Sequence, residues 1–193
     1  SIDSRRAPPR QPELRVRQKQ TCGLRSRIQA LGYRPQAFEC GEEMEIRYQR
    51  KIDLSAAEVW AELQHFDRVL NWVPGGKNST IAMQGEGPGA VRTLHLTTQG
   101  YVQHRLLTCD NTKRMLSYTL TGGKPLGMRD YTVTAKVGAI NDHLCCISWQ
   151  GEMTAQAPLN AGDIGHALEV GLQNMTSGLI AYIKGQPPQY RHQ

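Results

Sequence analysis

The chain has 193 residues, of which 39% are hydrophobic, and this suffices for one domain with a substantial core plus an appendage. It has no run of apolar residues long enough to cross a membrane, and its first residues lack the apolar stretch of a secretory signal. These features argue against integral membrane association. We therefore expect a soluble protein in the cytoplasm, or in an organelle if residues 1–40 include a targeting segment.

The formal net charge of +6 is concentrated in an N-terminal arm. Residues 1–38 hold nine of the 23 lysines and arginines and two of the 17 acidic residues, so the rest of the chain is close to neutral. Four prolines interrupt this arm, and we predict that residues 1–43 are flexible or packed on the body. A solvated tail, contact with an anionic partner and organelle targeting are alternatives for its role.

No sequence motif indicates a metal or a cofactor, and none is predicted. The five cysteines form neither a Cys-x-x-Cys pair nor a Cys/His group at zinc spacing. The motifs of nucleophile elbows, zinc proteases and dinucleotide-binding proteins are absent as well. The glycine-rich segment TGGKPLGMRDY, residues 121–131, is not a phosphate loop, because Lys124 is followed by Pro125 and a predicted strand rather than a helix comes next.

Beyond residue 43 the hydrophobic pattern becomes regular. Alternation over residues 44–53 predicts a half-buried strand. Ser55 and Glu58 then form the capping-box pattern of a short helix, and the following residues predict a second short helix that ends at Pro74. Six more strands, separated by turn residues, are predicted near residues 78–84, 90–98, 101–110, 114–122, 128–139 and 143–155.

Residues 160–185 predict a long amphipathic helix. Its apolar stripe repeats at steps of three and four residues and comprises Ile164, Leu168, Leu172, Met175, Leu179 and Ile183. The order of elements predicts an α+β fold in which a curved antiparallel sheet of about seven strands wraps around this C-terminal helix. We divide the chain into the arm (1–43), this domain (44–185) and a tail (186–193), and we expect a pocket between sheet and helix.

Polar side chains at apolar positions of the strands are the first candidate site residues. By strand alternation Arg92, His104, Tyr118 and Tyr131 fall on the face that points towards the helix. Buried polar groups must find partners, so these four either satisfy one another or address a ligand. Further candidates for ligand contact are Trp72, Leu94, Leu96, Leu120, Leu126, Met128, Trp149, Leu168, Leu172 and Met175. Leu126 and Met128 belong to the 121–131 loop, a candidate lid at the pocket mouth.

Several stretches resemble the START-like or SRPBCC superfamily over roughly residues 44–184. They are IDLSAAEVWAELQHFDRVLNWVP, GPGAVRTLHL, HRLLTCD, LSYTLTGGKPLGMRDY and the C-terminal helix. This superfamily includes polyketide cyclases, lipid-transport proteins, the birch-pollen allergen group and the plant abscisic acid receptors. The resemblance implies a helix-grip fold with a cavity for a hydrophobic ligand. It also implies movable loops, with TTQGYV at the place of the receptors' gate and GGKPLGMRDY at that of the latch.

Three functions are compatible with this sequence. The first is binding or transport of a hydrophobic or amphipathic small molecule between sheet and helix. The second is a cyclase or dehydratase type of enzyme without metal or nucleotide cofactor, in which Arg92, His104 and Tyr118 would stabilise an enolate and move protons. The third is a regulatory or assembly protein that recruits a partner through the basic arm. The sequence also leaves a homodimer open.

Overall fold

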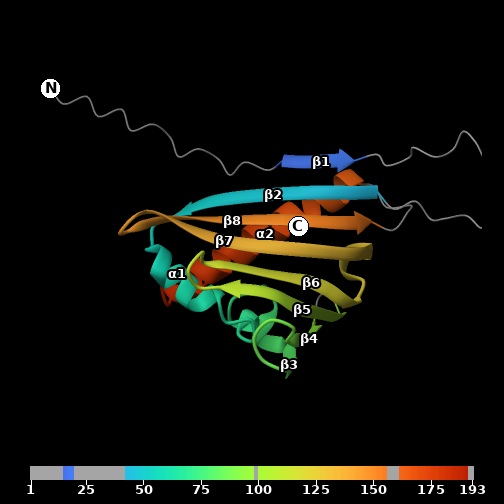
Figure 1. Cartoon of the computed structure of the whole chain (residues 1–193), viewed down its shortest axis with the longest axis horizontal. Helices are drawn as coiled ribbons and strands as arrows, with labels where there is room; N and C mark the ends of the chain where they lie inside the picture. The colour runs from blue at the N-terminus through green and yellow to red at the C-terminus, as the bar shows by residue number, and fades with distance from the viewer. Residues whose placement is uncertain (1–14, 20–41, 98–99, 156–160, 191–193) are drawn as a thin grey trace, which may run out of the picture.

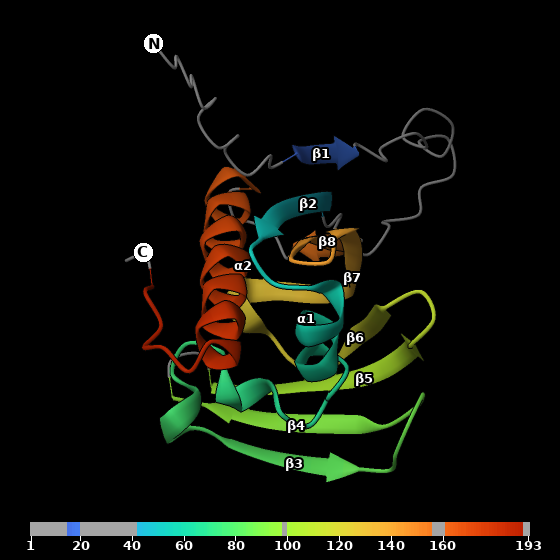
Figure 2. The same cartoon turned by 90° about the vertical axis from the view of Figure 1, so that its left-hand side faces the viewer.

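One eight-stranded antiparallel sheet curves around the C-terminal helix α2 (Figures 1 and 2). The computed structural model describes residues 15–19, 42–97, 100–155 and 161–190. The strand order is β1-β2-β8-β7-β6-β5-β4-β3. The strands are β1 (Arg15–Lys19), β2 (Glu42–Ile52), β3 (Thr80–Gln84), β4 (Val91–Leu96), β5 (Gly100–Asp110), β6 (Met115–Gly123), β7 (Met128–Asn141) and β8 (Leu144–Ala155). The α-helices are α1 (Ala56–Leu63) and α2 (Ala161–Ile183), and three 3-10 turns are η1 (Val69–Asn71), η2 (Gly76–Asn78) and η3 (Pro125–Gly127).

Helix α1 begins at the predicted capping box. The hydroxyl oxygen of Ser55 accepts a hydrogen bond from the Glu58 backbone N–H at 3.2 Å, and the Glu58 carboxylate accepts one from the Ser55 N–H at 2.8 Å. The second predicted short helix consists of the two 3-10 turns η1 and η2. Pro74 and Gly75, whose φ is +74°, separate these turns and prevent one continuous helix.

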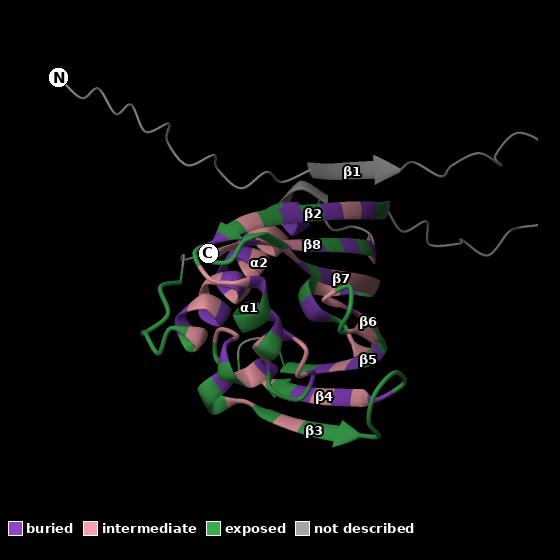
Figure 3. Cartoon of the chain, turned by 60° about the vertical axis from the view of Figure 1, so that its left-hand side comes forward, coloured by how far each residue is buried: buried purple, intermediate pink, exposed green. Residues whose placement is uncertain are grey.

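The predicted strands from β2 to β8 all form, and buried and exposed residues alternate along much of them (Figure 3). On β2, for example, Met44, Ile46 and Tyr48 are buried whereas Glu43, Arg47 and Gln49 are exposed. The buried residues face α1 and α2, because a period of two places every second side chain on one side of the sheet. The helix-grip architecture expected from the sequence is therefore confirmed.

Strand β1 adds an eighth strand to the predicted seven, and it comes from the basic arm. It pairs antiparallel with β2 at the edge of the sheet (Figure 1). In this register Arg15 lies opposite Arg47, Arg17 opposite Glu45 and Lys19 opposite Glu43. The strand RVRQK has a single apolar residue, which is why hydrophobic alternation did not indicate it. The other arm residues, and the roles considered for them, lie outside the described residues.

Two clusters of buried side chains join the sheet to the helices. The larger one, under α1 and the C-terminal half of α2, includes Trp149 and Leu179. The smaller one, at the start of α2, contains Met44, Ile46, Met128, Met153 and Ile164. Between α2 and η1 the backbones touch, since a β-carbon on Gly178 would lie 1.9 Å from the carbonyl oxygen of Trp72. This contact holds Trp72 against the helix.

Candidate ligand-binding site

The centre of the candidate site is the side-chain pair Arg92 and His104. These residues are direct cross-strand partners on β4 and β5, and their side chains are 4% and 5% exposed. The Arg92 Nε donates a hydrogen bond to His104 Nδ1 at 3.1 Å, and Arg92 Nη1 donates one to the carbonyl oxygen of Phe66 at 3.0 Å. Because a guanidinium has no acceptor, Nδ1 must be the unprotonated nitrogen of a neutral His104 ring.

Tyrosine and phenylalanine rings complete the cluster. The Nε2–H of His104 donates a hydrogen bond to the hydroxyl of Tyr131, which lies near the start of β7. The Arg92 guanidinium carbon lies 4.1 Å from the centre of the Phe66 ring and 4.9 Å from that of Tyr118. Both distances are within the range of cation–π attraction, so aromatic faces partly replace the hydration of the buried charge.

Burial sets the protonation states of this cluster. It lowers the pKa of His104 to about 2, with the positive charge of Arg92 acting in the same direction. It raises the pKa of Tyr118 and of Tyr131, and the Arg92 charge opposes both shifts. It also lowers the pKa of Arg92, although a guanidinium stays protonated at neutral pH. Near pH 7 the cluster therefore contains one cation, Arg92, and four neutral rings, three of which belong to titratable side chains.

A small cavity of about 10 Å³ lies beside Arg92, between the sheet, α2 and the segment that follows α1. This is roughly the smallest space that admits one water molecule. It is lined by Leu63, His65, Phe66, Trp72, Arg92, Leu116, Tyr118, Trp149 and Met175. The expected pocket is thus nearly filled by side chains in this conformation, because several of the residues assigned to its wall are large aromatic ones.

The structure brings together part of the predicted site residues. Five of them line the cavity, namely Trp72, Arg92, Tyr118, Trp149 and Met175, and His104 and Tyr131 continue the polar cluster. Leu94 is buried in the larger core cluster, and Leu96, Leu120, Leu168 and Leu172 are partly buried against the two clusters. Sequence reasoning missed Phe66, which lies in the irregular segment after α1 where no hydrophobic period applies.

The 121–131 loop does not cover the cavity as the sequence suggested. Leu126 is 39% exposed on the turn η3, where its φ is +52°. Met128 is buried, but in the smaller cluster next to Met153, because a register shift between Met128 and Asp130 turns its side chain inwards there. Among Leu126, Met128 and Tyr131, only Tyr131 contacts the pair Arg92 and His104, through its hydrogen bond with His104. Two residues of the proposed gate segment, 98 and 99, lie outside the described residues.

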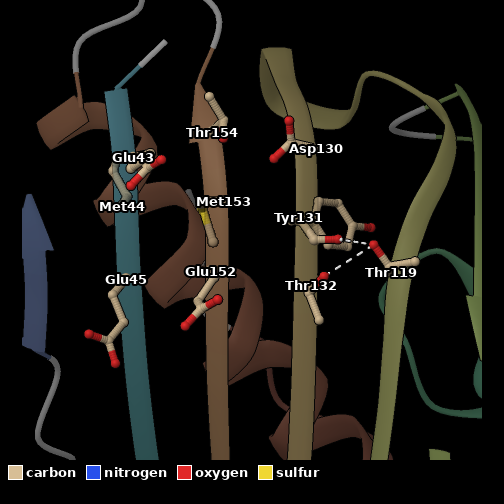
Figure 4. A pocket seen from close by; sticks show the side chains of 10 residues that line it. All are labelled: Glu43, Met44, Glu45, Thr119, Asp130, Tyr131, Thr132, Glu152, Met153 and Thr154. Atoms are coloured by element: carbon tan, nitrogen blue, oxygen red, sulfur yellow. Dashed lines mark hydrogen bonds between the residues drawn. The ribbon is translucent and has the colours of Figure 1, made fainter. Parts of the chain in front are cut away.

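A second hollow, of about 270 Å³, lies on the sheet across β2, β8, β7 and β6 (Figure 4). Its lining consists of Glu43, Met44, Glu45, Thr119, Asp130, Tyr131, Thr132, Glu152, Met153 and Thr154. It lies where β6 and β7 separate, since their pairing ends at Thr119 and Thr132. The hydroxyl of Thr119 donates to the Tyr131 carbonyl oxygen at 2.9 Å there. Within the described part of the chain, no group of His, Cys, Asp or Glu side chains could hold a metal ion.

Fold and site together define a helix-grip domain of the START-like superfamily. Residues 43–183 match the family described as "Polyketide cyclase / dehydrase and lipid transport", and the chain belongs to this family. No curated protein matches the sequence. In the described residues, no helix is both long and apolar enough to span a membrane.

Several solved structures share the fold at low sequence identity. Norcoclaurine synthase from Thalictrum flavum, in complex with dopamine and hydroxybenzaldehyde, is 14% identical, with a TM-score of 0.55 over 76% of this chain and 90% of that one. The protein Ara h 8.0201 is 17% identical, with a TM-score of 0.62 over 75% and 99%. A protein from Thermobifida fusca is 22% identical, with a TM-score of 0.57 over 77% and 99%. At these identities the likeness concerns the fold alone.

Proposed function

We propose that this domain binds an amphipathic small molecule in the interior between the sheet and α2. The observation that carries the proposal is the polar cluster of Arg92, His104 and Tyr131, which is built into an otherwise apolar interior beside a cavity. A stable core gains nothing from such a cluster, because burying polar and charged groups costs free energy that apolar side chains would not cost. Membership of a family that includes lipid transport supports the same function.

A ligand enters this interior only if side chains move. The cavity of about 10 Å³ is too small for any organic molecule, so its wall must yield. Met175 is the wall residue best suited to this, because a methionine side chain is unbranched and adapts its shape readily. We expect ligand binding to displace the Met175 side chain.

The hydrogen bonds and the low pKa of His104 favour ligand binding without catalysis over the cyclase alternative. Both of its ring nitrogens are already engaged, by Arg92 and by Tyr131. A group with a pKa of about 2 is a weak base near neutral pH, whereas efficient general bases have a pKa near the operating pH. No described carboxylate forms an ion pair with His104 that would raise its basicity. These features do not favour the proton transfer that Arg92, His104 and Tyr118 would need to perform.

The proposed function is tested with N-phenyl-1-naphthylamine, an uncharged apolar probe that becomes fluorescent in apolar surroundings. We expect saturable binding of one probe per chain to the full-length protein. Met175→Phe, which adds volume at the cavity wall, should weaken this binding about tenfold, which corresponds to about 1.4 kcal/mol. The matched control is Met115→Phe on β6, because Met115 is outside the cavity lining and alternation places its side chain on the opposite face of the sheet from the lining residue Leu116.

Thermal unfolding of both variants checks that each is folded before the probe is added. Absence of saturable binding to the wild type would contradict the proposal. An equal loss of binding in the two methionine variants would do so as well, because the probe would then not occupy the interior.

A further inference from the structure

The charge of Arg92 lacks a counterion in the part of the chain that the structure describes. No Asp or Glu side chain forms an ion pair with it, and its direct contacts are a neutral imidazole, a backbone carbonyl and two aromatic rings. Buried charges in proteins are normally paired with an opposite charge or a metal. Arg92 is fully enclosed yet keeps its positive charge without such a partner, so the interior has an excess of positive potential.

The neighbouring titratable groups do not supply a negative charge. Burial keeps His104 neutral by lowering its pKa, and it keeps Tyr118 and Tyr131 protonated by raising theirs. These three groups face Arg92 from β5, β6 and β7, and His65 lines the same cavity. The negative charge must therefore come from outside this set of side chains.

A second donor in the same cavity also lacks a partner. The indole Nε1–H of Trp72 is buried and has no hydrogen-bond acceptor among the described residues, although the residue is only 4% exposed. The other two tryptophans differ in this respect. Trp149 donates to the Thr176 hydroxyl at 3.1 Å and Trp60 donates to the Asn111 side chain at 3.0 Å. Trp72 and Arg92 both line the same cavity, so a donor without an acceptor and a cation without an acidic partner among the described residues lie in one wall.

We propose that the ligand of this domain carries an anionic oxygen group, such as a carboxylate, which binds between the Arg92 guanidinium and the Trp72 indole N–H while its apolar part lies between the sheet and α2. This inference rests on the proposed function and adds the chemical class of the ligand. A carboxylate supplies the missing charge and accepts hydrogen bonds from both donors. An alcohol or a water molecule satisfies the Trp72 N–H but leaves Arg92 without a counterion, and a cationic ligand is repelled.

The test compares octanoate with 1-octanol, two probes of equal chain length that differ in the charge of the head group. Each is titrated into the ¹⁵N-labelled full-length protein, and the indole N–H signals of its three tryptophans are followed by NMR. We expect octanoate to bind at least tenfold more tightly than octanol. The Trp72 indole proton should show the largest downfield shift, because it gains a hydrogen bond that Trp60 and Trp149 already have.

Variants of Arg92 and Trp72 test whether the preference for octanoate over octanol depends on the Arg92 guanidinium and on the Trp72 indole N–H. Arg92→Met should bring the ratio of the two affinities close to one, and Arg92→Gln serves the same purpose if the methionine variant does not fold. Trp72→Phe keeps an aromatic ring but removes the N–H, and it should weaken octanoate binding several-fold. Trp60→Phe is the matched control, because it removes an indole N–H that is outside the cavity lining, and it should leave the ratio unchanged.

Equal affinity of the wild type for octanoate and octanol would overturn the anionic ligand while leaving the proposed function standing. Undiminished octanoate preference in Arg92→Met or Arg92→Gln would overturn it too. If neither octanoate nor octanol shifts any indole signal, the interior is not a ligand site, and this result would contradict both proposals together.

Discussion

Gly178→Ala is expected to destabilise the domain by about 3 kcal/mol, the upper part of the range for overpacked interiors. The reason is that the new β-carbon would lie 1.9 Å from the carbonyl oxygen of Trp72 and 3.0 Å from its carbonyl carbon. Both atoms belong to the backbone, so no rotamer change removes the clash. Either α2 or the segment after η1 must move, and the packing of Leu179 in the core is then disturbed.

Equilibrium unfolding in urea measures this change, with Gly171→Ala as the matched control on the same helix. No atom lies within 4 Å of a β-carbon built at Gly171. Alanine there should raise the free energy of unfolding by about 0.5–1 kcal/mol, because glycine disfavours a helix interior. Opposite signs for the two glycines are the expected result. Equal effects would contradict the close contact between α2 and the backbone at Trp72.

Acidification from pH 6.5 to pH 4.5 should cost about 2–3 kcal/mol of stability through His104 alone. In the unfolded chain this histidine binds a proton below its ordinary pKa of 6.5, whereas in the folded protein it stays neutral down to about 2. The unfolded state therefore binds more protons between these values, and the free energy of unfolding falls as the pH falls. Arg92, Tyr118 and Tyr131 surround the ring and do not themselves change charge in this range.

The His104 contribution is isolated by comparing the wild type with His104→Gln, since carboxylates also begin to titrate near pH 4.5. A glutamine can still accept from Arg92 and donate to Tyr131, but it does not titrate. The difference between the two unfolding free energies should change by about 2–3 kcal/mol across the interval. His95→Gln, at an exposed position of β4, is the control and should follow the wild type. A pH-independent difference for His104→Gln would show that this histidine is not buried as described.

The sequence predicted the architecture because apolar residues recur with the periods that strands and helices require. Alternation in the strands and the capping box of Ser55 and Glu58 depend on residues close in sequence, and the structure forms both. The pairing of Arg92 with His104 also follows from two strands that are consecutive along the chain. Once the faces of β4 and β5 are assigned, these two residues fall on the same side, and the register brings them opposite each other.

Other features depend on packing that no local pattern encodes. Phe66 contacts Arg92 from an irregular segment, and Met128 turns inwards because of a register shift rather than an alternation. Strand β1 forms by pairing with β2, which is distant in sequence, and not because of a hydrophobic alternation of its own. The volume of the cavity reflects how Trp72, Tyr118 and Met175 fill one space, which composition alone does not determine.

The interior cavity and the hollow on the sheet, both formed by described residues, are alternative sites for the ligand. The interior cavity is small, but its wall contains Arg92, which has no acidic partner among the described residues, and Trp72, whose indole N–H has no acceptor among them. The hollow on the sheet is larger but is lined by four carboxylates, Glu43, Glu45, Asp130 and Glu152, which disfavour an anionic ligand. We therefore expect an amphipathic anion to bind in the interior cavity and to enlarge it, although the hollow on the sheet is already larger.

The most direct measurement is the set of nuclear Overhauser effects between octanoate and the methionine methyl groups of the protein labelled with ¹³C-methyl methionine. The chain has six methionines, and they distinguish the two hollows. Met175 lines the interior cavity, whereas Met44 and Met153 line the hollow on the sheet. We predict effects from the octanoate chain to the Met175 methyl group. Effects confined to Met44 and Met153 would contradict a ligand held between the sheet and α2.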